Sequence, residues 1–242
     1  MFQQAINNYL STHHYENLNL KAVLFDMDGV LFDSMKNHAT AWHEAMKRYN
    51  MHLSREEAYM HEGRTGAATI NIVSTRQRNH EATEEEIKEI YNTKSEIFNS
   101  LPTAERMPGA LELLQKVKQD NLIPVVVTGS GQKSLLERLN KNFPDIFKAE
   151  LMVTAFDVKY GKPNPEPYLM ALQKAGIRPN EAIVVENAPL GVRAGVAAGI
   201  FTIAVNTGPL PDKVLLDEGA NYLFSSMSEF DKNWENFYQA IK

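Results

Sequence analysis

The sequence of 242 residues is 43% hydrophobic and 23% charged, which is typical of a globular protein with one large domain or a core that carries an insert. Its formal net charge is −5, and no cluster of Lys and Arg longer than two residues occurs. We therefore expect no nucleic-acid partner, because phosphate-backbone binding needs a concentrated basic face. The absence of cysteine excludes disulfides, thiolate catalysis and sulfur metal sites.

The N-terminal segment 1–19 is predicted to be an extension that precedes the first domain. It is compatible with a short helix, and it has neither the basic start nor the apolar stretch of a secretory signal. No apolar run approaches the length of a membrane span, so we expect no membrane association. We expect a cytoplasmic protein and a monomer.

Short apolar runs rich in β-branched residues recur near the start of the chain and through its second half. They lie at 22–25, 123–127, 151–153, 183–185 and 201–205. Runs of this length without charge are typical of strands buried on both faces of a parallel sheet, and amphipathic stretches of helical period lie between them. This alternation predicts an α/β fold with a doubly wound, Rossmann-like parallel sheet.

Residues 36–101 interrupt the alternation, because no strand-like run occurs there. The stretch predicts four helices, near 36–49, 54–61, 67–79 and 83–100. A helical block directly after the first strand is an insert rather than part of the sheet. We therefore expect a four-helix cap at 36–101 and a catalytic core formed by 20–35 together with 102–242.

Polar residues of catalytic type follow four of the predicted strands. In open α/β sheets, ligands bind at the carboxyl ends of the strands, so these residues are expected to converge. They are Asp26 and Asp28 after the first strand, Thr128, Gly129 and Ser130 after the second, Lys162 after the third, and Glu186 and Asn187 after the fourth.

The acids suggest a metal site. Asp26 and Asp28 are two residues apart, which places both side chains on the same face of an extended chain. Carboxylates this close repel each other unless a cation lies between them or one of them binds a proton. Oxygen ligands without sulfur favour Mg²⁺, and Glu186 and Asn187 supply further oxygens.

The remaining strand ends suggest a site for phosphate. Thr128 and the amides of Gly129 and Ser130 are expected to form an anion cradle, and Lys162 is a point charge able to neutralise a phosphoryl group. Positioned cations and donors of this kind are what phosphoryl transfer requires.

The sequences DMDGV at 26–30, VVVTGS at 125–130, GKPNPEPY at 161–168 and VVENAPLGVRAGVAAGI at 184–200 resemble the four motifs of the haloacid dehalogenase superfamily. More narrowly, the chain from residue 20 onward resembles the β-phosphoglucomutase-like subfamily, whose helical cap follows the first strand. The resemblance implies that Asp26 is a nucleophile that forms an aspartyl-phosphate and that Asp28 is the general acid and base.

The same resemblance implies roles for the other motif residues. Thr128 and Lys162 would hold the transferring phosphoryl group, and His38 would orient the general acid. Mg²⁺ would bind to Asp26, the backbone carbonyl of Asp28, and the pair Glu186 and Asn187.

Two departures from the family pattern point to a small substrate. Asn187 stands where the family usually has a second acid. The corresponding cap loop of β-phosphoglucomutase resembles Lys-Gly-x-Ser-Arg, and here Glu62 replaces the lysine and Gly66 replaces the arginine. Glu62 facing the metal would restore the lost charge. The loop resembles that of a bacterial inorganic pyrophosphatase branch, and the cap residues expected to contact the substrate are Arg64, Thr65 and Lys94.

Several alternatives remain open at this stage. A sugar-phosphate phosphatase and a β-phosphoglucomutase use the same core residues, and the cap loop argues against the mutase. A catalytically inactive phosphate-binding homologue conflicts with the intact Asp26, Asp28, Thr128 and Lys162. A phospho-accepting receiver domain would be about half this length and would have no helical insert.

Overall fold

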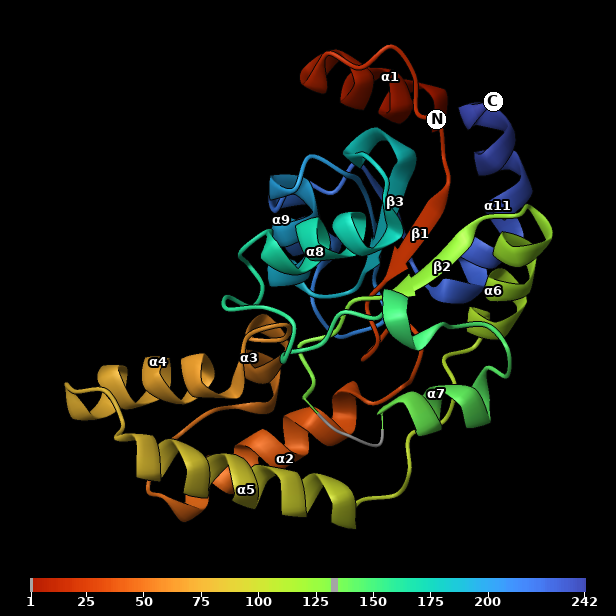
Figure 1. The fold of residues 1–242 in the computed structure, drawn as a ribbon. Helices are drawn as coiled ribbons and strands as arrows, with labels where there is room; N and C mark the ends of the chain where they lie inside the picture. The colour runs from red at the N-terminus through yellow and green to blue at the C-terminus, as the bar shows by residue number, and fades with distance from the viewer. Residues whose placement is uncertain (1, 132–134) are drawn as a thin grey trace.

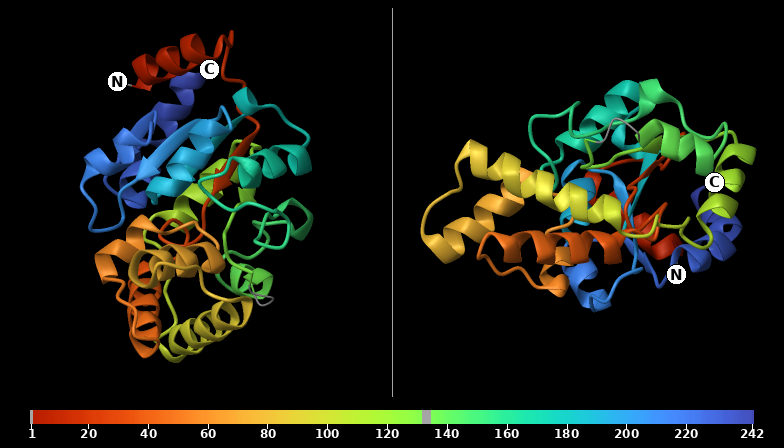
Figure 2. Two further views of the ribbon diagram at one scale, coloured as in Figure 1. Left: turned by 90° about the vertical axis from the view of Figure 1, so that its left-hand side faces the viewer. Right: turned by 90° about the horizontal axis from the view of Figure 1, so that it is seen from below.

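A computed structural model describes residues 2–131 and 135–242. A parallel sheet flanked by helices forms the core, and a group of four helices, the cap, lies against one end of it (Figure 1). The N-terminal helix lies at the end of the molecule opposite the cap, close to the C-terminus (Figure 2). Among the described residues, no helix is both long enough and apolar enough to cross a membrane.

The sheet has five parallel strands in the order β2-β1-β3-β4-β5. The strands are β1 (Ala22–Phe25), β2 (Ile123–Val126), β3 (Ala182–Glu186), β4 (Phe201–Val205) and β5 (Tyr222–Phe224). The predicted α/β fold with a helical cap is confirmed. The predicted strand at 151–153 is wrong: Val153 forms only an isolated bridge with Val127, and Ala149–Leu151 is a 3-10 helix, η1.

The helices divide between core and cap. The core helices are α1 (Phe2–His13), α6 (Ala110–Gln119), α7 (Leu135–Asn142), α8 (Glu166–Ala175), α9 (Pro189–Ala197), α10 (Asp212–Asp217) and α11 (Met227–Ile241), with the short 3-10 helix η2 (Pro179–Glu181) before β3. The cap helices are α2 (Met35–Arg48), α3 (Arg55–Met60), α4 (Gly66–Arg78) and α5 (Glu84–Ser100).

The central strand explains why the apolar runs predicted the sheet. All four residues of β1 are buried, and alternate side chains enter different layers. Val23 and Phe25 belong to the cluster beneath α1, α6 and α11, whereas Ala22 and Leu24 belong to the cluster beneath α8 and α9. A strand covered on both faces has no polar positions, which is the pattern of the sequence.

The cap has a hydrophobic core of its own. Trp42, Met46, Ile70, Val73 and Ile90 are among its buried residues, and they come from three of the four cap helices. The longest of these helices, α5, begins at a capping box. The Thr83 side chain accepts a hydrogen bond from the Glu86 amide, and the Glu86 side chain accepts one from the Thr83 amide. The cap is therefore a separately packed layer that can present side chains to the core.

The N-terminal segment packs on the core. Ile6 and Tyr9 of α1 are buried, and the Tyr9 hydroxyl donates to the carbonyl of Gly199 at 2.9 Å. Burial raises the pKa of Tyr9 above its ordinary range. The expected helix in 1–19 is thus present, on the side of the core away from the cap.

Candidate active site

The strand ends bring the predicted core residues together. Asp26 follows β1 and continues the pairing, because its amide donates to the carbonyl of Val185 on β3 at 3.0 Å. The Lys162 ammonium lies between two carboxylates, 2.5 Å from Asp26 Oδ1 and 2.6 Å from Glu186 Oε1, and also donates to the Val127 carbonyl at 3.0 Å. These side chains are almost completely buried.

Burial and charge act against each other in this cluster. Burial raises the pKa of Asp26 well above its usual range, and the charge of Lys162 opposes this, while Glu186 adds to it. Burial alone would lower the pKa of Lys162, but the carboxylates of Asp26 and Glu186 outweigh it and raise that pKa. Lys162 is therefore a permanent cation, and a further positive charge beside Asp26 would favour the ionised nucleophile.

Two buried oxygens fit a hard cation. Among the described residues, Asp26 Oδ2 and Asn187 Oδ1 have no hydrogen-bond partner, which is costly for buried polar atoms unless something binds them. Both are the oxygen type that Mg²⁺ prefers. Within residues 2–131 and 135–242, no cluster of three acids or histidines has the arrangement of a metal site. The residues present thus fit Mg²⁺ through a carboxylate, an amide and backbone oxygen rather than through three acids.

Glu186 has a different environment from the one predicted for a metal ligand. Its Oε1 accepts from Lys162 and, at 2.7 Å, from the Tyr168 hydroxyl. Its Oε2 accepts from the amides of Asn187 and Ala188 at 3.1 and 3.2 Å. Each oxygen therefore already accepts two hydrogen bonds, which is the full capacity of a carboxylate oxygen. This geometry assigns Glu186 to holding Lys162, and it leaves Asn187 with the free oxygen.

Asp28 is the end of a chain of hydrogen bonds from the cap. Ser34 Oγ donates to Asp28 Oδ1 at 2.5 Å, and His38 Nε2 lies 3.2 Å from the same oxygen. The other ring nitrogen of His38, Nδ1, lies 2.9 Å from Lys94 Nζ. Because the ammonium can only donate, Nδ1 accepts and Nε2 carries the proton that faces Asp28. Burial raises the pKa of Asp28, but His38 and Ser34 outweigh it and hold that pKa below its usual range.

The Lys94 ammonium therefore contacts His38, whereas the sequence predicted that it contacts a substrate phosphate. It is buried, and its ammonium lies 5.2–5.9 Å from the rings of Trp42, Tyr91 and Phe98. Burial lowers the pKa of Lys94, and the charges of Glu62 and Asp28 oppose this. The side chain connects the cap to Asp28 through His38, and a contact of Lys94 with a substrate stays a prediction.

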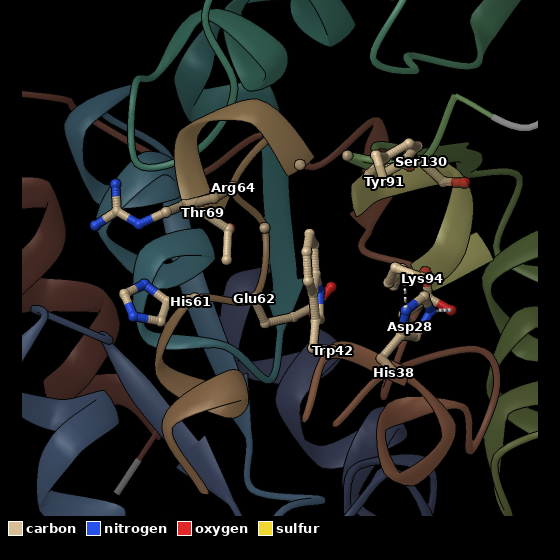
Figure 3. A pocket seen from close by; sticks show the side chains of 13 residues that line it. Asp28, His38, Trp42, His61, Glu62, Arg64, Thr69, Tyr91, Lys94 and Ser130 are labelled. Carbon is tan, nitrogen blue, oxygen red and sulfur yellow. Dashed lines mark hydrogen bonds and ion pairs between the residues drawn. The ribbon is translucent and has the colours of Figure 1, made fainter. Parts of the chain in front are cut away.

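The cap loop contributes a carboxylate to the same pocket. Glu62 lies among Asp28, His38, Lys94 and Lys162; its enclosure raises its pKa, with the charge of Asp28 adding to this effect and the three basic groups opposing it. Figure 3 shows its carboxylate on the side of Trp42 and Asp28. The expectation that Glu62 faces the core site is thus matched by its position.

The other two loop residues lie differently. The guanidinium of Arg64 points away from Asp28, His38 and Lys94 (Figure 3). Thr65 is the N-cap of α4, and its side chain accepts from the Ala68 amide at 3.3 Å. Arg64 nevertheless lines the pocket, and contacts of both residues with a substrate stay a prediction.

The cradle after β2 is pre-formed by its own threonine. Thr128 is buried, and its Oγ accepts from the Ser130 amide at 3.0 Å. Gly129 lies against the cap loop, where a β-carbon would be 3.3 Å from the Gly63 carbonyl oxygen. The Ser130 amide, predicted to bind anions, is therefore engaged within the loop.

The family model of haloacid dehalogenase-like hydrolases matches residues 23–205. The chain belongs to this family. It is 32% identical over 190 residues to hexitol phosphatase A of Escherichia coli K12, covering 78% of this chain and 84% of that protein. It is 30% identical over 203 residues to a phosphorylated carbohydrates phosphatase of Thermotoga maritima, covering 83% and 92%.

A solved structure extends the similarity to the whole chain. A candidate β-phosphoglucomutase from Bacteroides vulgatus is 73% identical, with a TM-score of 0.98, covering 100% of this chain and 98% of that one. The superfamily and its β-phosphoglucomutase-like subfamily are thereby confirmed, and the chain is a hydrolase of the phosphatase type. The narrower prediction of a pyrophosphatase branch finds no support among these relatives, which are named for phosphorylated sugars.

Sequence reasoning assigned no role to three residues that complete the site. The Tyr168 hydroxyl donates a hydrogen bond to Glu186, and the Ser34 hydroxyl donates one to Asp28. The Arg138 guanidinium lies 3.9 Å from the centre of the Phe32 ring and interacts electrostatically with Asp28. Tyr168 ends the quoted GKPNPEPY motif, so its position was a usable signal. Ser34 and Arg138 reach the site through loop and helix packing, which the sequence pattern does not encode.

Proposed function

We propose that the chain is a Mg²⁺-dependent phosphohydrolase that works through a phosphorylated Asp26, and that its substrate is small, with inorganic pyrophosphate best supported by the geometry. The observation that carries the substrate proposal is the pocket between cap and core. It has a volume of about 40 Å³ and is lined by Asp28, Glu62, Tyr91 and Lys94 among others. This is room for roughly three water molecules, so the pocket must open for either candidate, and a compact charged substrate requires a smaller opening than a hexose phosphate.

The wall of this pocket is rigid on the cap side. A β-carbon on Gly66 would be 2.3 Å from the Tyr91 ring, so the ring packs directly on the loop backbone. Tyr91 is also 6.3 Å from the Trp42 ring, centre to centre. Enlarging the pocket for an organic leaving group therefore requires the cap to move or the ring to turn.

A sugar-phosphate phosphatase is the second candidate, and the relatives favour it. Hexitol phosphatase A and the phosphorylated carbohydrates phosphatase are named for such substrates, and so are 2-deoxyglucose-6-phosphate phosphatases 1 and 2 of Saccharomyces cerevisiae. These comparisons support phosphorylated sugars better than pyrophosphate. The specific observation on the other side is a half-buried cap carboxylate that lines the pocket, Glu62, which would repel a substrate phosphate unless a cation lies between them.

The metal would be held by oxygens of the core and of the cap loop, and two of them, on Asp26 and Asn187, have no other partner among the described residues. Asp26 Oδ2, Asn187 Oδ1 and the Asp28 carbonyl are the proposed core ligands, and Glu62 is the proposed cap ligand. Bound there, Mg²⁺ would neutralise charge on the phosphoryl group and between the carboxylates. Asn187 is held in place by close packing, because a β-carbon on Gly29 would lie 2.0 Å from its Nδ2.

The chemistry of two steps can be assigned to side chains. In the first, an Asp26 oxygen bonds to phosphorus while the bond to the leaving oxygen breaks, and Asp28 gives that oxygen a proton. In the second, Asp28 takes a proton from water, the water oxygen bonds to phosphorus, and the bond to Asp26 breaks. Lys162 and Thr128 stabilise the phosphoryl oxygens in both steps.

A substrate comparison tests the proposal. The purified protein with Mg²⁺ is assayed for phosphate release from pyrophosphate, hexitol phosphates, 2-deoxyglucose 6-phosphate and fructose 1-phosphate. We expect kcat/KM for pyrophosphate to exceed that of every sugar phosphate by at least about tenfold, or ~1.4 kcal/mol of transition-state stabilisation. A sugar phosphate that exceeds pyrophosphate by this margin would replace the first candidate by the second. Asp26→Asn is the inactive control for contaminating phosphatases.

A further inference from the structure

A groove runs along the seam between cap and core, on the outer side of the catalytic lysine. It has a volume of about 440 Å³ and is lined by Arg64, Thr65 and Ala68 of the cap and by the core loop 159–164. The stem of Lys162 forms part of its wall, while the ammonium of the same residue contacts Asp26. The groove is therefore separated from the nucleophile by little more than one side chain.

The cap loop completes that wall. Gly63 has a φ of +87°, and a β-carbon there would be 3.0 Å from Lys162 Cδ and strained in its backbone. On the core side, a β-carbon on Gly161 would lie 3.0 Å from Thr65 Cγ2. Cap and core thus meet at two glycines, and the seam groove has a defined floor when the cap is closed.

Arg64 links the groove to the inner pocket. It lines both cavities, and its Nε is buried without a hydrogen-bond partner among the described residues. Burial lowers the pKa of Arg64, and the nearby charge of Arg193 adds to this effect. Arg193 itself is paired with Glu218 at 2.6 Å. Arg64 is therefore a guanidinium with unused donors, placed between the catalytic pocket and the seam.

Lys159 is the second cation of the groove. Its ammonium lies 5.0 Å from the ring centre of Tyr160, which restrains the side chain. Its backbone is fixed by Glu166, whose carboxylate accepts from the amides of Lys159 and Tyr160 at 2.8 and 2.9 Å.

The acids near this loop are already engaged. Glu166 caps the loop backbone as described, and Asp157 pairs with Lys174 at 2.7 Å. Within the part of the chain that the structure describes, neither Arg64 nor Lys159 forms an ion pair. The groove thus carries two cations that form no ion pair among the described residues, next to a site proposed to handle phosphate.

We propose that the seam groove is an anion subsite in which Arg64 and Lys159 bind a phosphate group beyond the one held at Asp26. The proposal rests on the phosphohydrolase function proposed above. A guanidinium whose Nε has no partner among the described residues and an exposed ammonium are a combination suited to phosphate oxygens. The phosphate has two sources, either the product as it leaves or the terminal phosphate of a linear oligophosphate longer than pyrophosphate.

Inhibition by inorganic phosphate tests the subsite. Initial rates are measured against substrate at several phosphate concentrations, and the slopes are replotted against phosphate. In the wild type we expect an upward-curving replot, because two phosphates bind one enzyme molecule. In Lys159→Gln we expect a linear, competitive pattern, or a second inhibition constant weakened about three- to tenfold.

Matched variants separate the subsite from general charge effects. Lys232→Gln removes the same charge from an exposed position on α11 and should keep the curved replot. Lys159→Arg keeps the charge and should keep it as well. Arg64 variants do not separate the two cavities, because Arg64 lines both.

Tripolyphosphate distinguishes the two sources. If Lys159→Gln raises KM for tripolyphosphate but not for pyrophosphate, the groove takes the terminal phosphate of the substrate. If only the phosphate inhibition changes, the groove takes the released product. A linear competitive replot in the wild type, or a curved one that Lys159→Gln leaves unchanged, would overturn the proposal.

The outcome does not depend on the identity of the first substrate. If the substrate comparison favours a sugar phosphate, the same inhibition experiment is run with that ester. Failure of the pyrophosphate assignment and failure of the subsite are then separate results.

Discussion

Lys94 offers the sharpest test of how the cap acts on the catalytic acid. Its ammonium lies 2.9 Å from His38 Nδ1, and the opposite ring nitrogen lies 3.2 Å from Asp28 Oδ1. Lys94→Met keeps much of the stem among the aromatic rings but removes the donor. His38 then loses the contact that fixes its tautomer, and Asp28 loses an oriented donor.

The size of the effect follows from the kind of bond removed. A buried hydrogen bond to a charged group contributes about 1.5–3 kcal/mol. If that energy orients Asp28 in the transition state, kcat should fall about 10- to 100-fold, since ~1.4 kcal/mol corresponds to a factor of ten. KM should change by less than about threefold, because the Lys94 ammonium is engaged by His38 Nδ1 even though the side chain lines the pocket.

Steady-state kinetics on the best substrate supply the measurement, with circular dichroism to confirm the fold. Lys88→Met removes an exposed lysine from the same helix and should leave both constants within about twofold of the wild type. A large rise in KM with unchanged kcat would refute the positioning role. It would support instead the direct phosphate contact expected from the sequence.

Three further predictions concern the cap ligand, the metal ligand and acid stability. Glu62→Ala should reduce pyrophosphate turnover more than turnover of simple phosphate esters, and it should weaken the dependence on Mg²⁺; equal small losses would make Glu62 a surface charge. Gly29→Ala places a β-carbon 2.0 Å from Asn187 Nδ2 at a φ of +91°, so the Asn187 side chain must move. The Mg²⁺ affinity measured by calorimetry should therefore fall, and an unchanged affinity would remove Asn187 from the proposed ligands. Hydrogen bonds from Lys21 and the Arg178 backbone lower the pKa of Glu181 to about 2, so its stabilisation is present above the ordinary glutamate pKa of 4.5 and lost as pH falls through about 2. Glu181→Gln should therefore cost about 1 kcal/mol in urea unfolding at pH 7 and nothing near pH 2; an equal cost at both pH values would contradict the linkage.

The sequence predicted the sheet well where strands are buried on both faces. Such strands have few polar positions, and their short apolar runs identify β1, β3 and β4, in which Glu186 and Thr202 are the two polar residues. The sequence did not predict the edge strand β5, because it has only three residues and two of them are half-exposed. The apolar run at 151–153 was misread because Val153 makes a single bridge before the chain turns away.

The same contrast holds in the candidate site. Residues at strand ends were predictable, since the carboxyl edge of a parallel sheet gathers them whatever the loops do. The bond between Lys94 and His38 was not, because it joins positions 56 residues apart and depends on how α5 packs on α2. Metal binding by Glu186 stays a prediction, and the sequence could not show that Tyr168, Lys162 and two amides already use its four acceptor positions.

The central claim is that Asp26 carries the phosphoryl group between two steps. Asp28→Asn removes the base that activates water, so a phosphorylated enzyme should accumulate after rapid mixing with radiolabelled substrate and acid quench. The account predicts close to one labelled phosphate per chain, located on the peptide that contains Asp26 and abolished by Asp26→Asn. Turnover without any labelled protein, or a label on another residue, would contradict it.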